Sequence, residues 1–324
     1  MTKERNVAFD VMKGIAILLM VVGHCPVSHL LSRFIYSFHM PLFFLLSGMF
    51  FKSGGFGVDL QKGFRRLLVP YLLVGTLVVL ISILRMNLLT FSQSGTSISL
   101  EQYQACWNAL FWAGAVSIGD IPAIGSIWFL MALFMCRCLG SVLNNVKSRG
   151  VIAIAYLLWV TASPYVCLPL CMVSALGGLS FFMLGMHYRN LFVSLDKSKV
   201  VSAVLVVCWF VSMFLAKMDI GALHTGFPVV GWLGAVGGVY FVYRVSGYLA
   251  YRQLRLARWL SFLGVNSLLL LCIHKLDVAI IPYQKLYGLN LFPYWNYVIV
   301  LFRCVIAVSF TCCLYKKSLV RKIF

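Results

Sequence analysis

The sequence predicts an all-α polytopic membrane protein with about ten transmembrane helices. Hydrophobic residues make up 62% of the 324 positions and charged residues only 11%. Soluble globular domains are nearer half apolar, so a chain of this composition is expected to have the bilayer as its solvent. The apolar residues also fall into stretches of roughly 20 residues, the length that crosses a hydrocarbon core about 30 Å thick.

The first apolar stretch, 9–27, carries Asp10 and Lys13 and ends in Gly23-His24-Cys25-Pro26. It has no small-residue cleavage site, so we expect a retained helix and not a signal peptide. The following spans are expected at 34–51, 67–86, 122–142, 150–166, 169–188, 199–216, 225–244, 259–281 and 296–315. Residues 106–118 are expected to form an interfacial or a re-entrant helix, which leaves the exact span count open.

Lysine and arginine are spread unevenly over the links, and cytoplasmic loops collect these residues. With the N-terminus inside, 19 of the 27 fall on inner segments: Lys3, Arg5, Lys52, Lys62, Arg65, Arg66, Lys147, Arg149, Arg189, Lys197, Lys199, Arg244, Arg252, Arg255, Arg258, Lys316, Lys317, Arg321 and Lys322. The outer segments hold Arg33, Arg85, Lys217, Lys275 and Lys285, and three lie within spans: Lys13, Arg137 and Arg303. Both termini are therefore expected in the cytoplasm.

The net charge of +19 is explained by this topology and by contact with anionic membrane lipids. No zinc-finger, helix-turn-helix or aromatic RNA-binding motif accompanies it, so no nucleic-acid partner is expected. The 11 cysteines show neither a C-x-x-C pair nor metal-ligand spacing, and no metal is expected. The spans leave no room for a soluble domain, and residues 1–324 are expected to form one transmembrane domain.

Ionisable residues inside the first span are candidates for a functional site, because charge in hydrocarbon is costly. Eleven residues separate Lys13 from His24, which is three helical turns plus about 20°, so both side chains project from nearly the same face. His24 lies roughly 16 Å further along the axis. Asp10, three residues before Lys13, can neutralise it. The alternatives are a pair near a helix end with Lys13 reaching the interface, and an interior histidine that is merely hydrogen-bonded.

His39 lies near the outer start of the second span. A short link joins the first two spans, so the imidazoles of His24 and His39 are expected to face a common cavity. Imidazole is the side chain best suited to accept a proton near neutral pH. The pattern indicates acid–base chemistry inside the membrane.

Five sequence blocks resemble the membrane acyltransferase family 3, which O-acylates extracytoplasmic glycans. They are Asp10-x-x-Lys13-Gly14-Ile15-Ala16 running to Gly23-His24, Phe38-His39-Met40-Pro41-Leu42-Phe43-Phe44-x-x-Ser47-Gly48, Lys62-x-x-Arg65-Arg66-Leu67-Leu68-x-Pro70-Tyr71, Trp128-Phe129-Leu130, and Ser261-Phe262-Leu263-Gly264-x-Asn266-Ser267 followed by His274. The family usually has arginine where this chain has Lys13. Lysine keeps the charge but loses the planar fork.

The resemblance implies a multi-pass enzyme of the bacterial inner membrane that takes acetyl-CoA as donor and a glycan or lipid-linked sugar as acceptor. Lys62, Arg65 and Arg66 are expected to bind the donor's phosphates, since cationic side chains bind these by charge-assisted hydrogen bonds. The alternative is ordinary loop charge. A succinyl donor is equally compatible, and so are lipopolysaccharide, capsule, peptidoglycan or other acceptors.

In the mechanism that we expect, neutral His24 is the general base on an acceptor hydroxyl. Direct acyl transfer is favoured, and an acyl-histidine intermediate is the alternative. His39, Ser47 or backbone donors would stabilise the oxyanion. Trp128, Asn266 and His274 are weaker candidates for the pocket wall. The rival functions are a transporter that uses the buried Asp, Lys and His as a relay, and a non-catalytic scaffold.

Overall fold

The computed structural model describes residues 6–146, 150–166, 168–215, 218–224 and 226–324. Helix accounts for 77% of the chain, and the described residues contain isolated bridges but no strand, which confirms the all-α class. Lys3, Arg5, Lys147, Arg149 and Lys217, which enter the topology prediction, lie outside the described residues.

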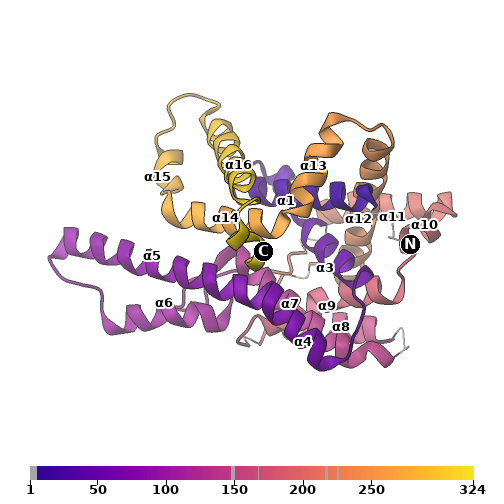
Figure 1. The fold of residues 1–324 in the computed structure, drawn as a ribbon, viewed down its shortest axis with the longest axis horizontal. Helices are drawn as coiled ribbons and strands as arrows, with labels where there is room; N and C mark the ends of the chain where they lie inside the picture. Colours follow the sequence, from indigo (N-terminus) through magenta and orange to yellow (C-terminus); the bar gives the residue numbers. More distant parts are fainter. Residues whose placement is uncertain (1–5, 147–149, 167, 216–217, 225) are drawn as a thin grey trace.

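The helices follow one another with short links (Figure 1). The first half contains α1 (Val7–Gly23), α2 (His29–Tyr36), α3 (His39–Met49), α4 (Phe56–Gly63), η1 (Phe64–Leu68), α5 (Val69–Ser94), α6 (Leu100–Trp112), η2 (Gly125–Ile127), α7 (Trp128–Val142) and η3 (Leu143–Asn145). The second half contains α8 (Gly150–Ala162), α9 (Met172–His187), α10 (Leu191–Asp196), α11 (Lys199–Leu215), α12 (Pro228–Tyr251), α13 (Arg255–Val265), α14 (Ser267–Ile280), α15 (Tyr283–Gly288), α16 (Trp295–Leu314) and α17 (Ser318–Ile323).

Each of the ten expected spans coincides with one helix or a helix pair, but fewer are long enough to cross a membrane. Within the described residues, five helices meet length and hydropathy requirements, and the bent pair α13–α14 makes a sixth if it counts as one span. The helices α8, α9 and α11 are apolar but have only 13, 16 and 17 residues. Several apolar helices could therefore span a membrane, while the number ten and the orientation of the termini stay predictions.

The third span is longer than expected, because α4, η1 and α5 run on as one helix from Phe56 to Ser94. Its five-residue π-helical segment ends at Leu68, two residues before Pro70. Proline donates no backbone hydrogen bond and clashes with the carbonyl four residues back, and a π turn relieves both conflicts.

Together α5 and α6 form a hairpin that projects from the body (Figure 1). Most of the expected 106–118 segment belongs to α6, which packs on α5.

The ninth span is not one straight helix. The axes of α13 and α14 meet at Asn266 at an angle of 75°. The side-chain Nδ2 of Asn266 donates to the carbonyl of Phe262 at 2.8 Å, satisfying an acceptor at the end of α13. The break turns α14 toward the centre of the molecule, where it packs against α1, α5 and α16.

The position of α1 is set by its close crossing with α13. A Cβ at Gly14 would overlap the carbonyl oxygen of Leu260, and one at Gly264 would overlap that of Asp10. The two backbones therefore touch, and only glycine fits at either position. The same helix also packs against α2, α3, α12, α14 and α16, so other helices surround it on several sides.

Candidate active site

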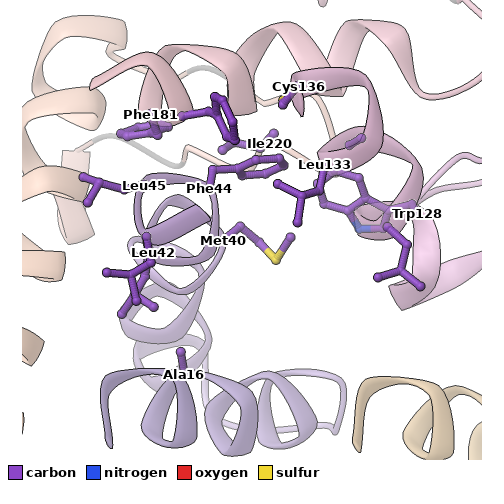
Figure 2. Packing of buried hydrophobic residues seen from close by; sticks show 14 of the residues in the cluster. Ala16, Met40, Leu42, Phe44, Leu45, Trp128, Leu133, Cys136, Phe181 and Ile220 are labelled. Carbon is purple, nitrogen blue, oxygen red and sulfur yellow. The ribbon is translucent and has the colours of Figure 1, made fainter. Parts of the chain in front are cut away.

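A cavity of about 360 Å³ lies between α1, α3, α7 and α14. Apolar residues of α3 and α7 form much of its wall, and Figure 2 shows Met40, Leu133 and Trp128 among them. Beyond these, a tightly packed aromatic and aliphatic core that includes Phe44 and Phe181 supports the wall. A close-packed core thus bounds the cavity on the side of α3 and α7.

One stripe of α1 lines this cavity with polar groups at both ends. Lys13, Ile17, Met20 and His24 follow one another at intervals of four, three and four residues, and all four contact the cavity. This confirms that Lys13 and His24 share a face. The Nζ of Lys13 lies 2.8 Å from Oδ1 of Asp10, which confirms the predicted ion pair. Asp10 is buried and Lys13 is partly exposed.

The backbone fixes the tautomer of the neutral His24 ring. Its Nδ1 lies 2.8 Å from the carbonyl oxygen of Met20. A carbonyl only accepts, so Nδ1 carries the hydrogen and Nε2 keeps its lone pair. His24 is exposed and lines the cavity. A proton acceptor is therefore open to a molecule in the cavity.

His39 faces the same cavity, as the short link between the first two spans predicts. Its Nδ1 donates to the carbonyl of Ile35 at 2.9 Å, so a neutral His39 also presents an acceptor at Nε2 and not an oxyanion donor. The ring of Tyr36 contacts both imidazoles, with centroids 6.5 Å from His24 and 5.1 Å from His39. The Tyr36 hydroxyl donates to the carbonyl of Gly23 at 3.1 Å.

The far side of His24 rests on α14 and α16. The ring of His274 stands edge-on to that of His24, 5.3 Å between centroids. Arg303, 2% exposed, donates from Nη1 to the backbone carbonyl of His24 at 2.9 Å and lies over the ring of Tyr283 at 4.5 Å. The Tyr283 hydroxyl in turn donates to Asp277. A buried cation thus holds the end of α1 that carries the imidazole.

A carboxylate from a distant loop completes the polar wall. Asp219 lines the cavity, and its Oδ1 accepts hydrogen bonds from the backbone N–H groups of Gly221 at 2.9 Å and Ala222 at 3.1 Å. The loop also contributes Gly221 and Ala222 to the cavity surface. His24 and Asp219, 195 residues apart in the sequence, therefore face one space.

The weaker candidates divide into two groups. Ser47 and Trp128 line the cavity and bring a hydroxyl and an indole N–H donor to it. Asn266 is not on the cavity wall; it closes the end of α13, and its neighbour Ser267 lines the cavity instead. His274 contacts His24 but is not part of the lining.

The basic triplet lies away from the cavity. Lys62 in α4 and Arg65 and Arg66 in η1 are exposed, and none of the three lines the cavity, although the next residue, Leu67, does. Within the described residues, no three His, Cys, Asp or Glu side chains come together as a metal-ligand set.

Residues 6–315, nearly the whole chain, match the family model described as the acyltransferase domain of acyltransferase family 3. The chain belongs to acyltransferase family 3. This family member is accordingly an acyltransferase with apolar helices able to span a membrane. A comparison with curated proteins found no match.

Sequence reasoning misses two site residues of this acyltransferase, Tyr36 and Asp219, and does not identify the partner of a third, Arg303. Tyr36 sits in a short amphipathic helix, and Asp219 is a single acid in a loop. Arg303 alone carries a signal, because a charge within a span needs a partner. The sequence does not show that this partner is the backbone of His24, 279 residues away.

Proposed function

We propose that this protein is an O-acetyltransferase that moves an acetyl group from cytoplasmic acetyl-CoA to a hydroxyl of an extracytoplasmic glycan or lipid-linked sugar. The observation that carries the proposal is the His24 imidazole, which presents an acceptor nitrogen to a cavity inside a family 3 acyltransferase. Family membership favours this reaction over the transporter and scaffold alternatives. The bacterial inner membrane is the location that fits such a donor and acceptor.

The reaction follows from the ring's geometry. Nε2 of His24 takes the proton of the acceptor hydroxyl while the hydroxyl oxygen attacks the carbonyl carbon of the thioester. The tetrahedral intermediate collapses with cleavage of the C–S bond, and the imidazolium returns the proton to the departing CoA thiolate. The proposal needs no covalent acyl-histidine, because the acceptor oxygen attacks the thioester directly while His24 carries only the proton.

The oxyanion needs a donor, and two side chains on the wall supply one. Ser47 and Trp128 both line the cavity, and their side chains carry a hydroxyl and an indole N–H as donors. Neutral His39 is the poorer choice, because its N–H is engaged by the Ile35 carbonyl. A preorganised donor is worth about 3 kcal/mol of transition-state stabilisation, so loss of the correct one should slow transfer by about 100-fold.

Mass spectrometry of surface glycans tests the proposal directly. Cells with the gene should carry acetylated glycans, and cells with the gene deleted, or with a gene encoding His24→Ala, should not. Purified protein should also gain thermal stability from acetyl-CoA or CoA. Glycans that are identical in all three strains would overturn the proposal, and a succinyl mass increment would reassign the donor.

A further inference from the structure

A second cavity, of about 710 Å³, opens at the end of the molecule where α1 begins. We call it the vestibule; the residues of its lining that matter here are Phe9, Lys13, Phe50, Lys52, Arg189 and Tyr243. Lys13 is the residue that it shares with the His24 cavity, among the residues that the structure describes. Lys13 therefore borders both cavities, and the vestibule lies on the predicted cytoplasmic side.

Charge in the vestibule is positive. Lys52, just after α3, and Arg189, just after α9, are both exposed and line it together with Lys13. The acid on its described lining is Asp10, which Lys13 neutralises at 2.8 Å. The two remaining cations are therefore available to an anionic ligand.

Arg189 is oriented before any ligand arrives. Its Nη2 donates to the backbone carbonyl of Phe51 at 2.7 Å, which ties the end of α9 to the end of α3 beside Lys52. The other guanidinium donors remain available for a phosphate. Arginine suits this role because its planar fork presents several N–H groups at once.

Aromatic rings form another part of the vestibule lining. Phe50 is 60% exposed, and its ring packs edge-on against Phe9 at 5.2 Å. Phe192 and Tyr243 stack at 4.5 Å with an interplanar angle of 14°. An exposed ring beside two cations is a suitable surface for a purine base.

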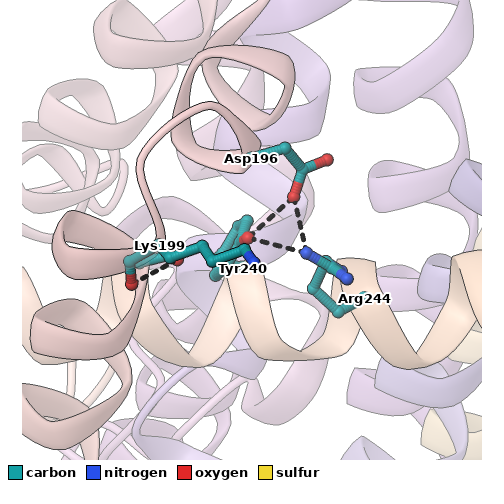
Figure 3. Close-up of polar contacts among 5 residues, drawn as sticks. Asp196, Lys199, Tyr240 and Arg244 are labelled. Atoms are coloured by element: carbon teal, nitrogen blue, oxygen red, sulfur yellow. Dashed lines mark hydrogen bonds and ion pairs between the residues drawn. The ribbon is translucent and has the colours of Figure 1, made fainter.

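A polar network holds this wall in place. The Asp196 carboxylate on α10 accepts from the Tyr240 hydroxyl at 2.7 Å and from Nη1 of Arg244 at 2.9 Å, both on α12 (Figure 3). The linked helices α10 and α12 carry Phe192 and Tyr243. The vestibule therefore has a preformed shape.

We propose that the vestibule binds the nucleotide part of the acyl-CoA donor, with Lys52 and Arg189 on its phosphates and Phe50 against its adenine. The thin pantetheine arm then passes Lys13 and brings the thioester to His24. This inference rests on the proposed function. It differs from the sequence-based expectation, which puts the phosphates on Lys62, Arg65 and Arg66, residues that line neither cavity.

Kinetics with two donors test the vestibule. Acetyl-CoA carries the phosphates, and acetyl-pantetheine carries the same thioester without them. Lys52→Gln and Arg189→Gln should each raise KM for acetyl-CoA by about tenfold at unchanged kcat, because each removes a charge-assisted contact. KM for acetyl-pantetheine should stay at the wild-type value. The control Lys197→Gln, at an exposed position outside both linings, should change neither KM.

Two results would overturn the proposal: unchanged KM for acetyl-CoA in both variants, or an equal rise in KM for both donors, which would show that these side chains do not act on the phosphates. Arg189→Lys separates charge from structure, since it keeps the cation but not the fork. The triple variant Lys62→Gln, Arg65→Gln, Arg66→Gln tests the alternative site. If it raises KM for acetyl-CoA but not for acetyl-pantetheine, while the vestibule variants behave as wild type, the phosphates bind at the triplet instead.

A binding experiment separates this proposal from the proposed function. If the purified protein transfers no acetyl group, CoA binding by calorimetry still reports on the vestibule, and weaker binding in Lys52→Gln and Arg189→Gln supports it. If His24-dependent transfer is intact and these variants behave as wild type, the vestibule assignment fails and the acetyltransferase stands. Absence of any CoA binding contradicts both.

Discussion

At the scale of single residues, the site depends on how His24 is held. The Met20 carbonyl selects its tautomer, and Arg303 binds the carbonyl of His24 itself. Periodicity along α1 predicts that Lys13, Asp10 and His24 belong together, because such neighbours are set by 3.6 residues per turn. Arg303 and Asp219 are not predictable in the same way, since their contacts depend on how distant segments pack.

Arg303 is expected to act as a positioning residue. Arg303→Met should lower kcat by about 100-fold with KM for the donor unchanged. Without the arginine the His24 imidazole is displaced slightly, and a small displacement of the general base slows acyl transfer strongly. Arg303→Lys should restore part of the rate by keeping a donor near the carbonyl. Steady-state kinetics on purified protein measure both values.

Arg137→Met provides the matched control, since Arg137 is also predicted within a span but lies over Phe51, away from the His24 cavity. Its kcat should equal that of wild type. If Arg303→Met and Arg137→Met lose activity equally, the two arginines serve general stability and the positioning role is wrong.

Asp219 is expected to stabilise the imidazolium that forms when His24 accepts a proton. Asp219→Asn keeps Oδ1 as acceptor for Gly221 and Ala222, so the loop is retained while the charge is lost. The kcat should fall about tenfold, because a tenfold change corresponds to about 1.4 kcal/mol, the size of one charge interaction that solvent partly screens. A wild-type kcat in a normally folded Asp219→Asn protein would show that the carboxylate has no part in proton transfer.

At the scale of elements, hydropathy locates the helices but not their breaks. The ninth expected span is divided at Asn266, and the third extends through a π-helical segment before Pro70. Both features depend on local backbone hydrogen bonding. Hydropathy averaged over a window of residues does not detect it. The break matters for function, because it sends α14 toward the cavity.

The crossing of α1 and α13 gives an element-scale prediction. Gly14→Ala should destabilise the protein by about 3 kcal/mol or more, because the added Cβ overlaps the backbone of Leu260 and cannot be accommodated by a side-chain shift. Thermal unfolding in detergent measures the change, and acetyl transfer should fall with it as α1 is displaced.

Gly247→Ala in α12 is the matched control, since a Cβ there meets nothing within 4 Å. It should leave stability unchanged or raise it by about 0.5–1 kcal/mol, the usual gain from alanine in a helix. Equal effects of the two substitutions on stability would show that helix propensity, and not the close crossing of α1 and α13, determines the effect of Gly14→Ala.

At the scale of the whole molecule, composition predicts the membrane class and charge asymmetry predicts the orientation. The vestibule, with Lys52 and Arg189, lies at the end assigned to the cytoplasm, and the His24 cavity extends from Lys13 toward the other end. The sequence predicts the stripe along α1 but not the two cavities, because a cavity depends on what all the surrounding helices leave unfilled.

The topology has its own test. Green fluorescent protein fused to the C-terminus should fluoresce, and alkaline phosphatase fused there should be inactive, because the basic segments Lys316, Lys317, Arg321 and Lys322 are expected to stay inside. The N-terminus should be protected from external protease. Active alkaline phosphatase would place the C-terminus outside the cytoplasm. That result would contradict the prediction of an even number of spans with both termini inside.

The central claim is that the His24 imidazole, open to the cavity through Nε2, is the base of the reaction. The most direct measurement is the rate of acetyl transfer from radiolabelled acetyl-CoA to extracted glycan by purified wild-type and His24→Gln protein in lipid nanodiscs. We predict a loss of at least about 100-fold, the usual contribution of a general base, with thermal stability and CoA affinity unchanged. A folded His24→Gln protein that transfers acetyl at the wild-type rate would contradict the account.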